Sequence, residues 1–128
     1  DATADAIDDA GIDTVGVLGT AAVMEGEFYA ERFADRGIDV MIPGSDDRAL
    51  VDDVIFEELT SGVIRDESQE AYLRVIDDLV NAGAEGVVLG CTEIELLVDQ
   101  SDRPGVPMFD TTALHVERAV ENSLGGVR

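Results

Sequence analysis

The chain has 128 residues, of which 29 are acidic and 8 are basic, and its formal net charge is −21. A charge of this sign repels a phosphate backbone and argues against nucleic-acid binding. All 8 basic residues are arginine, so a cofactor held as a lysine Schiff base, as pyridoxal phosphate is, is excluded. The single cysteine, Cys91, excludes an internal disulfide, and together with the single histidine, His115, it cannot supply the ligands of a structural zinc site.

No stretch reaches the ~20 apolar residues that cross a membrane, and residues 1–10 lack the basic segment of a signal peptide. We therefore expect a reduced, cytoplasmic protein that does not associate with membranes. The acids are spread along the chain, and their mutual repulsion is screened in molar salt, where the Debye length is about 3 Å. This pattern predicts a halophilic protein; the alternatives are an ordinary acidic protein or one that meets a basic partner.

Short apolar runs alternate with longer amphipathic segments along the whole chain. In chain order the pattern predicts a helix over 3–10, a strand over 12–18, a helix over 22–36, a strand over 38–42, helices over 45–59 and 67–81, a strand over 87–89, a short helix over 93–98, a strand over 106–109 and a helix over 111–124. Because such alternation is typical of crossover units, we expect one α/β lobe over 1–128, with a four-stranded parallel sheet flanked by helices.

Turn and cap residues mark several helix ends. Gly37 and Gly83 follow amphipathic segments and are candidates for the closing position of a helix. Ser45 and Asp46 precede another such segment and are candidate N-caps.

Polar side chains follow the predicted strands at their carboxyl ends, where parallel α/β sheets bind their ligands. Thr20 follows the first strand, and Cys91, Thr92 and Glu93 follow the third. A thiol at a helix N-terminus has its pKa lowered, so Cys91 is a candidate reactive thiolate. The alternatives are that Cys91 is a small buried apolar residue and that Thr92 and Glu93 only cap the helix.

The last predicted strand is followed by Thr111 and Thr112, with His115 one turn into the helix over 111–124. The two threonines are expected to cap this helix. A lone histidine in such a place is expected to be structural.

Four segments together resemble the aspartate/glutamate racemase family. GCTEI at 90–94 looks like the second cysteine motif of that family, and GTAAVMEGEFY at 19–29 is similar to its GT-x-x-TM-x-x-x-FY stretch. VIFEELTSG at 54–62 and PMFDTTALHVERAV at 107–120 match in the same order. The resemblance covers nearly the whole chain.

This resemblance implies a cofactor-independent amino-acid racemase built from two similar α/β lobes, each of which offers one acid/base residue to opposite faces of the substrate α-carbon. It implies that Cys91 is one of the two, that Thr92 and Thr20 contact polar groups of the substrate, and that Glu93 orients the site. Related members include decarboxylases and isomerases, and a lobe that only binds a small acid or its partner lobe is the alternative from a different class.

Three departures from the family pattern refine this expectation. The first cysteine motif is absent, so the chain resembles the C-terminal half alone, with an N-terminal lobe as its partner and a homodimer expected for the full-length form. Glu93 stands where cell-wall glutamate racemases carry histidine, which favours the aspartate-racemase branch. Thr60 stands where aspartate-specific relatives often carry lysine, which favours broader substrate specificity.

Overall fold

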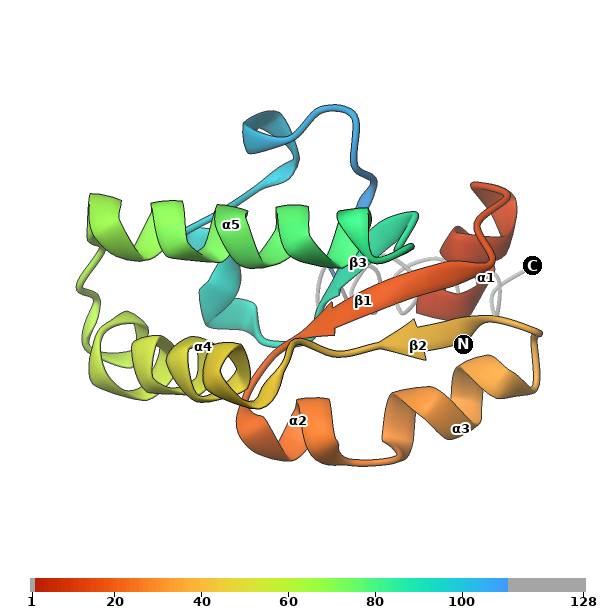
Figure 1. Ribbon diagram of the computed structural model, residues 1–128, viewed down its shortest axis with the longest axis horizontal. Helices are drawn as coiled ribbons and strands as arrows, with labels where there is room; N and C mark the ends of the chain where they lie inside the picture. The colour runs from red at the N-terminus through yellow and green to blue at the C-terminus, as the bar shows by residue number, and fades with distance from the viewer. Residues whose placement is uncertain (1, 111–128) are drawn as a thin grey trace, which may run out of the picture.

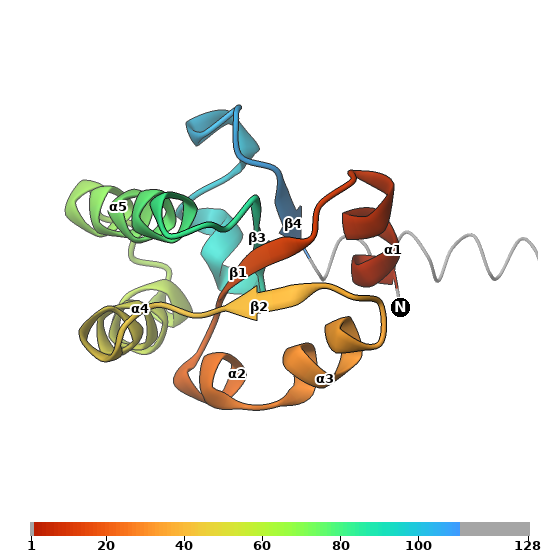
Figure 2. The same ribbon diagram turned by 45° about the vertical axis from the view of Figure 1, so that its right-hand side comes forward.

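The computed structural model describes residues 2–110 and shows three layers, with a parallel sheet between two layers of helices (Figures 1 and 2). The sheet has the order β2-β1-β3-β4, and all three neighbouring pairs are parallel. Its strands are β1 (Thr14–Leu18), β2 (Asp39–Met41), β3 (Gly86–Leu89) and β4 (Met108–Asp110). The predicted α/β class and the four-stranded parallel sheet are therefore confirmed.

The helices divide between the two faces of the sheet. They are α1 (Ala2–Asp9), α2 (Ala21–Glu25), α3 (Phe28–Ala34), α4 (Ser45–Glu57) and α5 (Asp66–Asn81), with the short 3-10 helices η1 (Leu59–Ser61), η2 (Thr92–Leu96) and η3 (Gln100–Asp102). Figure 2 shows α4 and α5 on the side of the sheet opposite to α1. Two apolar clusters fill the two interfaces: α4 and α5 pack on one face, and α1 and α3 pack on the other.

Strand β1 shows why the sheet is covered on both faces. Val15 and Val17 belong to the cluster under α1 and α3, whereas Leu18 belongs to the cluster under α4 and α5, and all three are buried. Adjacent side chains point to opposite faces of a strand, so an uninterrupted apolar run predicts burial on both sides. Between them, Gly16 lets α5 approach closely, because a Cβ there would lie 2.8 Å from Cδ1 of Leu79.

The helix predicted over 22–36 is wrong as one element, since the structure breaks it into α2 and α3. The break falls at Gly26, which has an extended backbone (ψ 164°) and closes α2 by donating its N–H to the Ala22 carbonyl. Because glycine is a poor helix former, ending α2 at Gly26 costs little helix stability. A Cβ at Gly26 would lie 2.7 Å from that same carbonyl oxygen, so the turn also requires glycine.

Three predicted helix ends can be compared with the structure. Gly37 and Gly83 both have positive φ (74° and 124°) and follow α3 and α5, as expected for residues that close a helix. The N-cap of α4 is Gly44, with no side-chain hydrogen bond, so the expectation for Ser45 and Asp46 is wrong. The helix predicted over 93–98 is the 3-10 helix η2.

The helix predicted over 111–124, with Thr111, Thr112 and His115, lies outside the described residues. Among the helices that the structure does describe, none is both long enough and apolar enough to cross a membrane.

Candidate active site

The pairing of β1 with β3 brings two of the predicted site segments together. Leu18 and Leu89 are partners in the register, and the Gly90 N–H donates to the Leu18 carbonyl at 2.7 Å. The residues that follow, Thr20 after β1 and Cys91 after β3, therefore leave the sheet side by side at its carboxyl edge. We call this edge the rim.

Two glycines allow the two turns at the rim to approach each other. A Cβ on Gly19 would lie 2.8 Å from Cγ1 of Val23, and one on Gly90 would lie 3.1 Å from both that atom and the Leu18 carbonyl oxygen. Any larger residue would push the turns apart. The glycine before the cysteine in the GCTE motif is thus explained by packing.

Cys91 is half-buried, and its thiol donates a hydrogen bond to Oε2 of Glu93 at 2.9 Å. Burial first, and then the Glu93 carboxylate, raise the pKa of the Cys91 thiol to about 11. The backbone N–H groups of Glu93 and Ile94 act in the opposite direction but are outweighed. The expected lowering of the pKa is therefore wrong: in this structure Cys91 rests as a thiol. The helix-terminus effect is weak here because η2 is a short 3-10 helix.

Thr20 is the N-cap of α2, and its hydroxyl oxygen accepts a hydrogen bond from the Val23 N–H at 3.3 Å. A hydroxyl that accepts in this way still has its own hydrogen to donate. The capping role and a contact with substrate are therefore compatible at Thr20.

Thr60 lies in η1, which packs against η2, the helix that begins at Thr92 directly after Cys91. Its hydroxyl donates to the Phe56 carbonyl at 2.9 Å, and the residue is exposed. The pairing of β1 with β3 thus brings together the segments of Thr20, Cys91 and Glu93, and the packing of η1 on η2 adds the segment of Thr60 at the same end of the sheet.

Tyr72, on α5, belongs to the apolar cluster against which Cys91 packs. It is fully buried, and its hydroxyl donates to the Val51 carbonyl at 2.6 Å. Burial raises the pKa of Tyr72, and the nearby Cys91, Glu58 and Asp52 raise it further. The site is therefore bordered by carboxylates.

The sequence does not mark Asp52 and Glu58 as members of this neighbourhood. Acids occupy so many helix positions that these two do not stand out. Glu58 accepts a hydrogen bond from the buried Ser68 hydroxyl at 2.6 Å. The Asp52 carboxylate accepts one from the Ala21 N–H at 2.7 Å.

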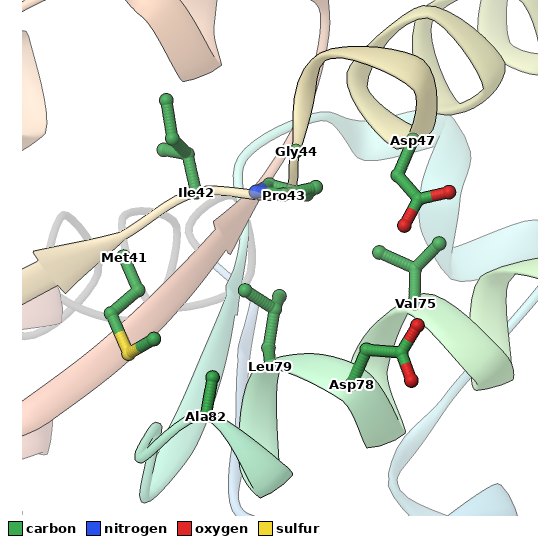
Figure 3. A pocket seen from close by; sticks show the side chains of 9 residues that line it. All are labelled: Met41, Ile42, Pro43, Gly44, Asp47, Val75, Asp78, Leu79 and Ala82. Atoms are coloured by element: carbon green, nitrogen blue, oxygen red, sulfur yellow. The ribbon is translucent and has the colours of Figure 1, made fainter.

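Two of the hollows on the described part of the surface have no lining from Cys91 or Thr20. One, of about 140 Å³, lies where the end of β2 meets α4 and α5, with the carboxylates of Asp47 and Asp78 at its wall (Figure 3). Arg74 pairs with both carboxylates, at 2.8 and 2.9 Å. The other, of about 260 Å³, lies beside the Cys91 turn, and its lining includes Leu89 and Glu95.

No group of three or more His, Cys, Asp or Glu side chains within the described range could hold a metal ion.

The chain is thus an α/β protein with a thiol and a carboxylate at the carboxyl edge of its parallel sheet. Ligands of such sheets bind at this edge. The family model described as Asp/Glu/Hydantoin racemase matches residues 1–119. The chain therefore belongs to the Asp/Glu/hydantoin racemase family, as its motifs indicate.

Solved structures and a curated relative agree with this membership. A proposed Asp/Glu racemase from Yersinia pestis is 46% identical with a TM-score of 0.91, over 96% of this chain and 54% of that one. An aspartate racemase homologue from Pyrococcus horikoshii is 33% identical with a TM-score of 0.87, over 94% and 52%. A glutamate racemase from Herpetosiphon aurantiacus is 33% identical over 77% of this chain and 39% of its own length. The chain spans about half the length of the solved structures it matches.

Proposed function

We propose that this chain supplies one wall of the active site of a cofactor-independent amino-acid racemase, with Cys91 as one of two acid/base residues. The observation that carries the proposal is the Cys91 thiol at the rim, hydrogen-bonded to Glu93 at 2.9 Å. Membership of the racemase family and likeness to racemase relatives support the reaction class.

Racemisation moves protons at the α-carbon on two opposite faces. In one direction Cys91, resting as a thiol, gives its proton to the α-carbon and becomes a thiolate, after a base on the other face has removed the original proton. In the reverse direction the Cys91 thiolate removes the α-proton. Glu93 orients the thiol and favours its protonated form, which is the form that donates the proton.

The second acid/base residue belongs to a lobe outside this chain. Cys91 is the only cysteine, and Glu93 lies on the same turn, so it approaches from the same side. We propose that residues 1–128 form the C-terminal lobe of a longer protein, with an N-terminal lobe as the opposite wall and a homodimer as the full-length form. The length of the relatives supports this arrangement.

Thr20 and Thr92 are proposed to contact polar groups of the substrate, which is aspartate, glutamate or one of a broader set of amino acids. Thr60, in η1 next to η2, is proposed to face the substrate side chain. It is uncharged, and this is the basis for including neutral amino acids in the set.

A second candidate is a lobe that binds a small acid, or only its partner lobe, without acting as a catalyst. The raised pKa of Cys91 favours this candidate, because a thiol is a poor base near neutral pH. Decarboxylation or a different isomerisation by the same thiol is the alternative within the enzyme class.

The test is deuterium uptake at the substrate α-carbon by this chain mixed with an N-terminal lobe, in molar salt. Cys91→Ser is expected to lower the rate by at least the ~10²–10⁴ that acid–base catalysis contributes, since a hydroxyl is far too weak an acid to replace the thiol. Ser101→Ala, at an exposed position in η3, is the matched control and is expected to keep the parental rate. Uptake at the parental rate by Cys91→Ser would refute the role of Cys91.

A further inference from the structure

Helix α4 contacts the segments that carry Thr20 and Thr60, and it also bonds to Tyr72 of α5. The Val51 carbonyl accepts from the hydroxyl of Tyr72, which packs in the same apolar cluster as Cys91. The Phe56 carbonyl accepts from the Thr60 hydroxyl. The Asp52 carboxylate accepts from the backbone of the turn that follows β1. Of these three contacts, only the last is made by a side chain of α4, so it is the one that a substitution in α4 can remove.

The bond from the Ala21 N–H to Oδ1 of Asp52 is 2.7 Å long, joins residues 31 positions apart and is partly buried. It holds the peptide directly after Thr20. Among the described residues, the Thr20 side chain bonds to Val23 of its own helix, and that bond does not fix the turn against the rest of the fold. Asp52 supplies that fixed point.

One turn earlier on α4, Arg48 approaches the other end of α2. Its Nε lies 3.4 Å from Oε2 of Glu25, the last residue of α2. Residues four apart lie on the same face of a helix. The Arg48 and Asp52 side chains on that face therefore contact opposite ends of α2, Arg48 by an ion pair and Asp52 by a hydrogen bond.

The turn that Asp52 holds is also the turn that packs on the cysteine segment. A Cβ on Gly19 would lie 3.7 Å from the carbonyl carbon of Gly90. A displacement of this turn would therefore change the position of Thr20 relative to Cys91.

We propose that Asp52 is a positioning residue that holds Thr20 beside Cys91 through its hydrogen bond to the Ala21 N–H. Asp52 touches no substrate and acts through the turn. That Asp52 holds the turn rests on the hydrogen bond alone. That this affects catalysis rests also on the proposed function. The acceptor matters more than the charge, so asparagine, which keeps an amide oxygen at the same place, is the conservative replacement.

The first experiment measures hydrogen exchange of the Ala21 amide in the 128-residue chain without substrate. Asp52→Ala is expected to speed this exchange at least tenfold, and Asp52→Asn to restore much of the protection. Asp53→Asn, which changes an exposed carboxylate on the next residue of α4, is the control and is expected to leave it unchanged. Equal exchange of the Ala21 amide in wild type and Asp52→Ala would overturn the proposal, provided that circular dichroism shows both proteins folded. If Asp52→Ala does not fold, Asp52→Asn replaces it in this measurement and in the double-mutant cycle described below.

The second experiment is a double-mutant cycle on α-proton exchange, with the N-terminal lobe present. If Asp52 acts through Thr20, Asp52→Ala raises KM severalfold more than it lowers kcat, Asp52→Asn has a smaller effect in the same direction, and neither adds anything once Thr20→Ala is present. Independent, multiplying effects would overturn the proposal. If the wild-type mixture shows no α-proton exchange, the proposed function fails, and Ala21 exchange in Asp52→Ala and Asp52→Asn still decides whether Asp52 holds the turn.

Discussion

Two opposing influences act on the Cys91 thiol. Backbone N–H groups favour the thiolate, whereas burial and the carboxylate of Glu93 favour the thiol and prevail. The GCTE motif predicts which residue carries the chemistry, but the protonation state depends on the direction in which Glu93 points and on how much water reaches the sulfur. Neither is encoded in the spacing of the motif, and this is why the expectation of a low pKa failed.

Alkylation of Cys91 by iodoacetamide reports its pKa directly. The rate constant is expected to rise with pH toward a midpoint of about 11 and to be slow near neutral pH. Glu93→Gln removes the negative charge and is expected to move the midpoint down and raise the rate at pH 8. Glu95→Gln, an exposed acid in the same 3-10 helix, is the control. A wild-type rate that has reached its plateau by pH 8 would contradict the structure.

The same pKa predicts a pH dependence of stability. The folded chain binds the thiol proton more tightly than the unfolded chain, whose thiol has its ordinary pKa of 9.0. This contribution is fully present below pH 9 and is lost as the pH rises to about 11. The free energy of unfolding of wild type is expected to fall relative to that of Cys91→Ala across this interval, measured by urea titration in molar salt. Parallel curves for the two proteins would rule the shift out.

At the scale of elements, the alternation of apolar runs was enough to predict the order of the elements and the parallel sheet. The break between α2 and α3 was not predicted, because Val23, Phe28 and Phe33 keep a helical spacing across Gly26 although Phe28 is exposed. The contacts made by α4 were not predicted either. A hydrogen bond over 31 positions, such as that of Asp52, leaves no mark on local periodicity.

The bond between Tyr72 and α4 gives a prediction at this scale. Tyr72→Phe keeps the shape of a fully buried ring and removes only the hydroxyl that donates to the Val51 carbonyl. The expected loss is about 1 kcal/mol of unfolding free energy, the usual net contribution of such a bond, measured by urea titration. Tyr29→Phe, at a half-buried ring, is the control and is expected to change less. A loss at Tyr72 no larger than that at Tyr29 would show that the hydroxyl contributes nothing.

Net charge is the dominant property of the whole molecule. The arginines that pair with carboxylates include Arg36, Arg48, Arg74 and Arg103, but 8 basic residues cannot offset 29 acids. The melting temperature followed by circular dichroism is expected to be higher in molar potassium chloride than in dilute buffer, since salt screens the repulsion. A melting temperature that is equal or higher in dilute buffer would contradict the prediction of a halophilic protein.

The most direct test of the half-site account is to follow the chirality of aspartate, glutamate and several neutral amino acids in molar salt, with this chain alone and with a separately made N-terminal lobe. Inversion needs one group on each face of the α-carbon, both positioned in advance. The account predicts no racemisation by the chain alone and racemisation by the mixture, lost in Cys91→Ala. Racemisation by the lone chain, at a rate proportional to its concentration and dependent on Cys91, would contradict it.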